Sequence, residues 1–366
     1  MRWLCFYILV AIQIFPAYPV AQTVREFVDV QATDKYSEPG LFETIFFGSN
    51  YRKEWGTFVT TPIFDIKNTN FQIKELGGGN QTISLELTDQ QNREWALRSV
   101  KKDVRPSSKF ANNELMKFII MEQTSGSYPY AGLTVYELAS AAGIPSGKQD
   151  LYYIPDDSSF GKYRRVMAND LFILVNRQPQ KTKGIKTDEL MQKLNSSANC
   201  YVDSKEYLKA RLVDWLVADW DRHSDQWRWA GEKTNSGIVY TVVPRDRDQA
   251  LYKSNGLLAM IAGFSFMPYI NKFNRHASGI KGLSKKAWTL DRQFLSSLNK
   301  KEWESAIKEF QKNISDSVIV RSVKKQPPEI FAISGKKMIK KLIARRNGLL
   351  KHVMKYYSFL KNYNKD

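Results

Sequence analysis

Cysteine is nearly absent from this sequence, which has only two in 366 residues. One of them, Cys5, lies in an N-terminal segment that we expect to be removed, so Cys200 would remain alone and could form no internal disulfide. Because no histidine or other base is near Cys200 in the sequence, a buried structural thiol is favoured over a nucleophile. Stability must therefore come from an apolar core, for which the hydrophobic content of 43% is sufficient.

Several catalytic motifs are missing as well. The sequence has no Gly-x-Ser-x-Gly elbow and no His-Glu-x-x-His run, which argues against the serine hydrolase and zincin classes. His276 and His352 each lack ligand partners at metal spacing, so structural or surface roles are favoured for both. No internal repeat or low-complexity linker is visible, and one cooperative unit is expected.

Long apolar runs are also rare, and the longest is at the N-terminus. A basic start at Arg2 is followed by an apolar run to Phe15 and then by a segment that ends in the small residue Ala21 before a cut, which is the pattern of a signal peptide. An uncleaved anchor is the alternative, but the run is shorter than the roughly 20 residues of a spanning helix and Pro16 would end it. We therefore expect residues 1–21 to be removed and the protein to be exported.

Basic residues outnumber acidic ones, with 55 Lys and Arg against 37 Asp and Glu and a net charge of +18. The excess is concentrated from Lys324 to Lys365. A solvated face of a helix at about 335–360 is favoured, and an anionic membrane surface or a polyanionic partner is the alternative. Nucleic acid is not an expected partner. The apolar stripe that this helix should pack inward consists of Ile339, Leu342, Ile343, Leu349, Leu350 and Val353.

The predicted elements change character along the chain, from mostly β to mostly α. Alternating apolar residues predict strands at 83–87, 94–101, 151–154 and 171–175, and helical spacing predicts helices at 112–123 and 133–142. From Ser204 onward helices dominate, apart from a β-branched strand at 238–243. This order predicts an α+β fold with a β-rich N-terminal lobe (22–176) and a helical C-terminal lobe (177–366).

Two acidic clusters each follow a regular element. The first, Asp221-Arg222-His223-Ser224-Asp225-Gln226, follows a predicted helix at 207–220, and the second, Arg245-Asp246-Arg247-Asp248, follows the strand at 238–243. Carboxylates of this kind suit Mg²⁺, and one could accept a hydroxyl proton. The alternative is a structural ion-pair network formed by Asp221, Arg222, Asp246 and Arg247 beneath neighbouring tryptophans.

Asp221-Arg222-His223, with the amide of Gln226, resembles the catalytic loop of phosphoinositide-3-kinase-like and HipA-like kinases, and also the Asp-Arg-His segment of secretory-pathway casein kinases. The run from Val243 to Asp248 resembles the Asp-x-Asp segment of the spore-coat CotH kinases. This resemblance implies an atypical protein-kinase-like, two-lobed fold that binds Mg²⁺ or Mn²⁺ and ATP or another nucleotide.

The kinase resemblance also implies roles for individual residues. Asp221 would be the base and His223 an orienting residue, while Gln226, Asp246 and Asp248 would hold the metal. Two further roles concern phosphate: Gly77, Gly78 and Gly79 would form the phosphate loop, and Arg98 or Lys101 would pair with phosphates. Glu122 would lie on the equivalent of the kinase C-helix. Two departures are visible, because Gly77-Gly78-Gly79 is not the usual spaced glycine pattern and Gln226 is one methylene longer than asparagine.

A second resemblance covers nearly the whole mature chain. Tyr-Arg-Lys-Glu-Trp at 51–55, Gly-Gly-Gly-x-Gln-Thr at 77–82 and Asp-Arg-His-x-Asp-Gln-Trp-Arg-Trp at 221–229 resemble a bacterial envelope family. It implies a location in the periplasm or at the outer membrane, with envelope proteins as partners. Two alternatives to an active kinase stay open: an inactive interaction or assembly module, and a metal-dependent phosphoester hydrolase.

Overall fold

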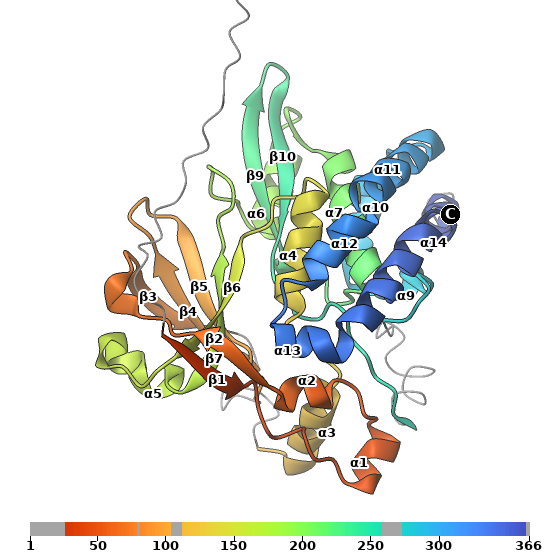
Figure 1. Ribbon diagram of the computed structural model, residues 1–366. Coiled ribbons are helices and arrows are strands. Elements are labelled where there is room, and N and C mark those ends of the chain that lie inside the picture. The colour runs from red at the N-terminus through yellow and green to blue at the C-terminus, as the bar shows by residue number, and fades with distance from the viewer. Residues whose placement is uncertain (1–25, 79–80, 104–111, 258–272, 364–366) are drawn as a thin grey trace, which may run out of the picture.

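The structure is a computed structural model that describes residues 26–78, 81–103, 112–257 and 273–363 (Figure 1). The predicted signal peptide at 1–21 and the predicted phosphate-loop residue Gly79 lie outside the described residues. Within the described ranges, no helix is both long enough and apolar enough to span a membrane.

One side of the molecule is a five-stranded antiparallel sheet with the strand order β3-β4-β5-β7-β6. Its strands are β3 (Gln72–Gly77), β4 (Ser84–Thr88), β5 (Glu94–Ser99), β6 (Gln149–Ile154) and β7 (Asp170–Asn176). The alternation of apolar residues gives the sheet one buried face, on which Leu85 of β4 lies opposite Leu97 of β5. These leucines share a small core with Phe160 and Met167, so the segment that contains α5 (Arg164–Met167) covers this face.

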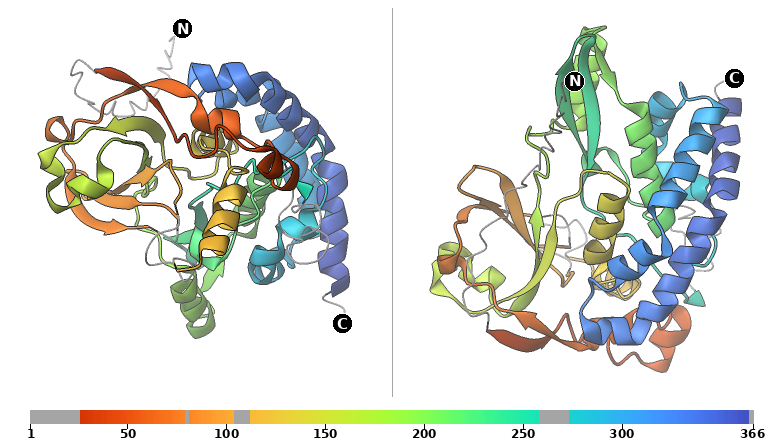
Figure 2. Two further views of the ribbon diagram at one scale, coloured as in Figure 1. Left: turned by 90° about the horizontal axis from the view of Figure 1, so that it is seen from below. Right: turned by 45° about the horizontal axis from the view of Figure 1, so that its top comes forward.

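Helices form the other side, as the two further views in Figure 2 show. The central helix is α7 (Ser204–Val217), in which almost every side chain from Tyr207 onward is buried. Its neighbours are α10 (Trp288–Leu295), α11 (Lys300–Asn313) and α14 (Lys336–Tyr363). Shorter helices complete this side: α6 (Thr187–Ser196), α9 (Ile280–Leu283), α12 (Asp316–Val323) and α13 (Pro328–Ile330).

A small sheet joins α7 to the rest of this side. It consists of β8 (Cys200–Val202), β9 (Trp227–Thr234) and β10 (Gly237–Pro244). The central strand, β10, is parallel to β8 and antiparallel to β9. Because β9 and β10 form a hairpin, the segment before β9 and the segment after β10 meet at the same end of the hairpin.

The larger apolar core draws residues from both halves of the chain. The helices of the first half are α1 (Leu41–Phe46), α2 (Arg52–Gly56), α3 (Glu114–Thr124) and α4 (Ala131–Ala141), and a two-stranded ribbon consists of β1 (Phe27–Gln31) and β2 (Phe58–Pro62). Helix α4 packs against α7 and α12, and Trp55 of α2 is buried in the same core. The packing therefore does not divide at residue 176, although the sheet itself ends there.

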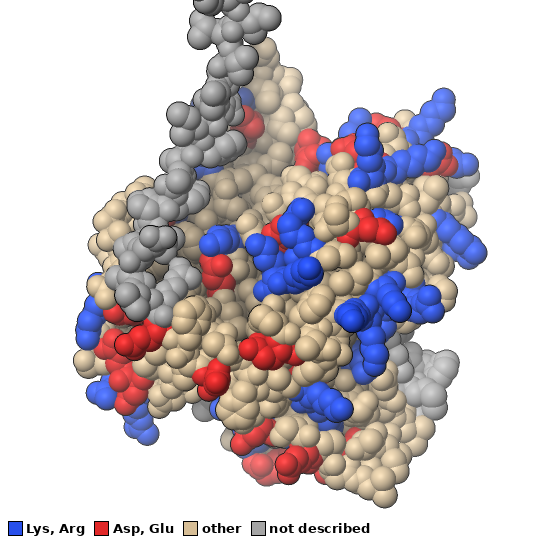
Figure 3. Space-filling view, in the orientation of Figure 1, with Lys and Arg blue, Asp and Glu red and all other residues tan. Residues whose placement is uncertain are grey.

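The C-terminal helix confirms the predicted apolar stripe. Leu342, Leu349 and Val353 are buried in the larger core, and Ile339, Ile343 and Leu350 pack against it partly buried. The opposite side of α14 carries exposed lysines, and basic side chains are frequent over α11, α12 and α14 in Figure 3. The amphipathic pattern alone was sufficient to predict which side of this helix faces inward.

Candidate active site

A cleft of about 770 Å³ separates the five-stranded sheet from the helical side. Sites for small molecules commonly have volumes of about 300–1,000 Å³. The sheet contributes side chains of β4 and β5 and the end of β7 to the lining, and the helical side contributes the segments that follow α7 and β10. The cleft is therefore lined by the two acidic clusters that the sequence indicated.

The β9–β10 hairpin brings these two clusters together. Pro244 pairs with Trp227 at the end of the hairpin, and the next backbone N–H, that of Arg245, donates to the carbonyl of Gln226 at 2.9 Å. The chain reaches this place from α7, which ends at Ala218 in the left-handed conformation with a φ of 56°. Asp221 and Asp246 consequently line the same cleft.

Two arginines of the clusters, Arg222 and Arg247, turn inward. Arg222 is completely buried, and its guanidinium donates to the carbonyls of Arg245 at 2.7 Å and Gln226 at 3.1 Å. The same group lies over the ring of Trp227, with its central carbon 4.2 Å from the ring centre. Arg222 therefore fastens the segment before β9 to the segment after β10.

A buried carboxylate, Asp214 of α7, balances these arginines. Its oxygens lie 3.3 Å from Nε of Arg222, 3.0 Å from Nε of Arg247 and 2.9 Å from Arg211. Burial alone would raise the pKa of Asp214, but the three guanidiniums hold it below its ordinary value. The structural ion-pair network weighed as an alternative is thus present for Arg222 and Arg247, whereas Asp221 and Asp246 have other partners.

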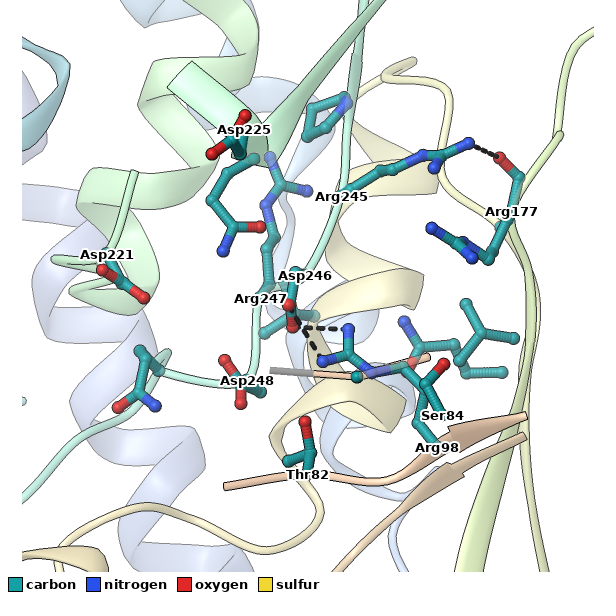
Figure 4. A pocket seen from close by; sticks show the side chains of 18 of the residues that line it. Thr82, Ser84, Arg98, Arg177, Asp221, Asp225, Arg245, Asp246, Arg247 and Asp248 are labelled. Carbon is teal, nitrogen blue, oxygen red and sulfur yellow. Dashed lines mark hydrogen bonds and ion pairs between the residues drawn. The ribbon is translucent and has the colours of Figure 1, made fainter. Parts of the chain in front are cut away.

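Three aspartates of the clusters, Asp221, Asp246 and Asp248, turn toward the cleft, as Figure 4 shows. Asp246 forms a bidentate ion pair with Arg98 of β5, with N–O distances of 2.6 and 2.9 Å. Asp248 lies 2.8 Å from Nζ of Lys102, and Asp221 pairs with Lys286. Burial raises the pKa of Asp246, but Arg98 outweighs this effect and the pKa is lowered overall. The pKa of Asp248 is instead raised, by burial and by repulsion from Asp246.

The backbone at Asp246 has an unusual conformation, with a φ of 50°. Aspartate visits the left-handed region more readily than most residues, but the conformation still costs free energy. Such residues persist where the surroundings fix them, and they gather at functional sites. Here the carbonyl of Asp246 accepts from Arg222 at 3.3 Å, so the buried arginine helps to hold the strained residue.

Most of the residues with predicted roles line this cleft: Gly78, Arg98, Asp221, His223, Gln226, Asp246 and Asp248. His223 is partly exposed, and its Nε2 lies 3.3 Å from the amide nitrogen of Gln226. Gly77 ends β3 and is not among the lining residues.

Lys101 and Glu122 are not brought to the cleft. Nζ of Lys101 lies 3.8 Å from Asp103 and 3.9 Å from Asp170, and this residue, which follows the end of β5, is not among those that line the cleft. Glu122 of α3 is buried in an ion pair with Arg52 of α2. Of the two basic candidates, only Arg98 can meet a ligand in the cleft.

Other lining or supporting residues were not predicted. Lys102 holds Asp248 and is only 6% exposed, and Lys286 comes from a lysine-rich segment distant in sequence. Arg177 follows β7 and lines the cleft together with Arg228 and Arg245. No local pattern marks Lys102, Lys286 or Arg177, because they meet the other cleft residues only in the tertiary fold.

The oxygen donors suit a cation that shares its coordination with a bound phosphate. Asp246, Asp248 and Gln226 offer hard oxygens, and Mg²⁺ often takes only one or two carboxylates together with substrate phosphates. Among the described residues, no group of three or more His, Cys, Asp or Glu side chains could hold a metal ion by itself. A cation would also have to displace Arg98 from Asp246.

Comparisons with known proteins concern the fold. No family model and no curated protein matches the chain. Among solved structures, the chain is similar to the Helicobacter pylori proinflammatory kinase CtkA, with 12% identity over 80% of this chain and 99% of that chain and a TM-score of 0.42. For the Shewanella oneidensis HipA of a complex with HipB and operator DNA, identity is 11%, coverage is 82% and 70%, and the TM-score is 0.39.

The Golgi casein kinase with Mn/ADP bound is also similar, with 9% identity over 88% of this chain and 83% of that chain and a TM-score of 0.38. The chain itself has the α+β fold that the sequence predicted, with a β-rich N-terminal region and a helical C-terminal region on either side of the cleft.

Proposed function

We propose that this protein is an exported, kinase-like phosphotransferase that binds Mg²⁺ or Mn²⁺ together with a nucleotide or another phosphate compound in the cleft. The observation that supports it most is that the aspartates and the buried arginines of the two clusters face opposite directions. Asp221, Asp246 and Asp248 turn toward one cleft, while Arg222 and Arg247 fix the backbone behind them. A purely structural network would not need the three carboxylates at the cleft.

Each cleft residue has a role in this proposal. Asp246 and Asp248, with the amide oxygen of Gln226, would hold the cation, which would neutralise phosphate charge. Arg98, once released from Asp246, would donate to phosphate oxygens. Asp221 would take the proton of the acceptor hydroxyl, as the hydroxyl oxygen bonds to the terminal phosphorus of the donor and the bond to the leaving oxygen breaks.

Calorimetric titration of the purified protein with Mn²⁺, with and without a nucleotide, tests the proposal. Asp246→Asn should weaken cation binding, whereas Asp221→Asn should retain binding and lose transfer. Asp225→Asn is the matched control, because this carboxylate of the same segment is 81% exposed and should be dispensable. Absence of both binding heat and a thermal shift in the parent would rule out the phosphotransferase.

An inactive envelope interaction or assembly module is the second candidate. Its support is that the cleft carboxylates already have cationic partners, in Arg98, Lys102 and Lys286, so the charges are balanced without a metal. A rise in melting temperature with nucleotide and Mg²⁺ would favour the enzyme over the module. Labelled phosphate that ends in solution and not on an acceptor would favour a phosphoester hydrolase.

The location is part of the proposal. We infer export to the periplasm or the outer membrane from the predicted signal peptide, with envelope proteins as partners. The exposed lysines of α14 would suit an anionic membrane surface. Cell fractionation tests this: an intact N-terminus embedded in the inner membrane would contradict it.

A further inference from the structure

Three arginines line the side of the cleft away from Asp221. They are Arg177, Arg228 and Arg245, which we call the arginine cluster. Figure 4 shows Arg177 and Arg245 reaching toward each other on one side of the pocket, with Asp221 on the other side. The arginines come from the end of β7, from β9 and from the segment after β10, so the cluster depends on both sides of the cleft.

Positive charge exceeds negative charge around this cluster. Arg177 pairs with Glu86, and Glu94 is shared between Arg245 at 3.1 Å and Lys183 at 2.7 Å. In the described part of the chain, Arg228 donates to the backbone carbonyls of Asp225 at 3.0 Å and Trp227 at 2.8 Å and forms no ion pair. Three carboxylates, those of Glu86, Glu94 and Asp225, therefore face four cationic side chains.

Burial and the neighbouring guanidiniums both lower the pKa of two of these arginines. Burial, together with repulsion from Arg177 and Arg228, lowers the pKa of Arg245 to about 10. Burial and Arg177 also lower the pKa of Arg228. An oxyanion bound among the three guanidiniums would relieve this repulsion, and planar guanidinium groups match phosphate and carboxylate oxygens well.

The backbone at this edge of the cleft is already paired within the protein. The N–H of Arg177 donates to the carbonyl of Glu94 at 2.8 Å, and the N–H of Asn176 donates to that of Lys148 at 3.0 Å. The carbonyl of Arg177 accepts from Arg245 at 3.2 Å. These two backbone N–H groups are thus not available to a ligand, and the charged donors that line this edge are the three guanidinium groups, which favours an anion over a neutral heterocycle such as a nucleotide base.

We propose that the arginine cluster binds an oxyanion, so that the compound in this cleft carries a phosphate or carboxylate at the end remote from the cation. The statement about the far end of the ligand rests on the proposed function, whereas the anion site itself does not. The substrate class that follows is a phosphate ester with a second acidic group, in place of a nucleotide whose base lies at that end.

The test uses inorganic pyrophosphate as the probe, titrated into the full chain in EDTA without nucleotide. Arg228→Gln and Arg177→Gln should each weaken binding by about tenfold, because each removes one charge-assisted contact. Lys351→Gln, which removes one exposed charge of α14 far from the cleft lining, should change affinity by no more than about twofold.

Malonate, titrated in the same way, shows whether the arginine cluster binds carboxylates as well as phosphates. Binding of pyrophosphate alone assigns the cluster to phosphate, and binding of both assigns it to oxyanions in general. No pyrophosphate binding in the parent, or equal affinity in the parent and both cluster variants, would overturn the proposal even if Mn²⁺ and nucleotide bind. Conversely, failure of Mn²⁺ to bind would leave the anion site standing. If Arg228→Gln does not fold, Arg177→Gln decides.

Discussion

Arg98 occupies the position at which a cation would have to meet the protein. Both its terminal nitrogens contact the carboxylate of Asp246, and the two side chains remain about a quarter exposed (25% and 28%). A pair this accessible can open, because water can solvate both partners. The same guanidinium can therefore compete with a cation when phosphate is absent and assist binding when phosphate is present.

Arg98→Gln should consequently tighten Mn²⁺ binding in the absence of nucleotide, by about tenfold, because a positive charge beside Asp246 is removed. The same variant should weaken nucleotide binding in the presence of Mn²⁺. Calorimetry with the two ligands measures both effects. Arg164→Gln, which breaks an exposed pair with Asp156 in the same lobe, is the control. Weaker Mn²⁺ binding in Arg98→Gln would contradict this account.

A second single residue, Asp219, makes the stability of the folded protein depend on pH. It is completely buried below the Asp221 segment, and burial raises its pKa from 3.8 to about 7, with Asp214 adding to the effect and Arg222 opposing it. The folded protein therefore holds this proton more tightly than the unfolded chain. Stability falls as pH rises through the interval between these two values, and this group adds no further pH dependence below or above that interval.

Asp219→Asn should remove this dependence. The unfolding free energy of the variant, relative to the parent, should improve by about 2 kcal/mol between about pH 5.5 and about pH 7.5. Urea titrations at both pH values measure the difference. A constant difference between variant and parent across that range would show that Asp219 stays ionised in the folded protein.

At the scale of elements, one side chain connects the last helix, α14, to the end of α7, which leads into the Asp221 segment. Arg345 of α14 is buried, and its guanidinium donates to the carbonyls of Leu216 at 2.6 Å and Trp215 at 2.7 Å, at the end of α7. It also donates to the carbonyl of His276 at 2.6 Å. A cation at the C-terminus of a helix is favourable, although burial lowers the pKa of Arg345 to about 9.

Arg345→Gln should lower the unfolding free energy by about 3 kcal/mol, because several buried carbonyls lose their donor. Arg346→Gln is the neighbouring control and should cost less than about 1 kcal/mol, since its carboxylate partner Asp316 is mostly exposed. Chemical denaturation of the two variants compares them directly. Equal costs would mean that the α7 terminus finds other donors.

Periodicity predicted the strong elements and missed the weak ones. The strands β4, β5, β6, β7 and β10 and the helices α3, α4 and α14 lie where apolar spacing indicated them. The strand β3 was missed because it is an edge strand with mostly exposed or half-buried residues. The strand β9 was missed because Gly231, Glu232 and Lys233 interrupt its apolar pattern.

The candidate site was predictable only in part, for a similar reason. Asp221, Asp246 and Asp248 stand out because each cluster follows a regular element. The choice between Arg98 and Lys101 depends on where β5 ends, which propensity does not fix to one residue. The partners Lys286 and Arg177 are distant in sequence and carry no local signal.

For the whole molecule, the larger core is closed by elements from both ends of the described chain. Trp55 of α2 and Leu342 of α14 belong to the same buried cluster. A buried hydrogen bond also joins the two halves of the chain, because the hydroxyl of Tyr128, near the start of α4, donates to the side-chain oxygen of Gln326 at 2.7 Å. Neither half is therefore expected to complete this core alone.

A chain that ends at Gln326 should lose cooperative unfolding, because it lacks α13 and α14 and exposes their side of the core. Thermal melting followed by near-ultraviolet circular dichroism is the measurement. A chain that ends at Tyr363 keeps the whole helix and should melt like the parent. A cooperative transition in the shorter chain would show that α14 is an added contact surface.

The contrast between the inward side chains of Arg222 and Arg247 and the cleft-facing side chains of Asp221 and Asp246 has a practical consequence for genetics. Asp221→Asn with Asp246→Asn should leave Arg222, Arg247 and Asp214 in place, so the folded protein would persist in the cell at its normal abundance. A strain that carries this double variant could then be compared with a deletion strain. A defect that the deletion shows and the double variant lacks would be caused by loss of the folded protein. A defect that both strains share would be caused by loss of the reaction in the cleft.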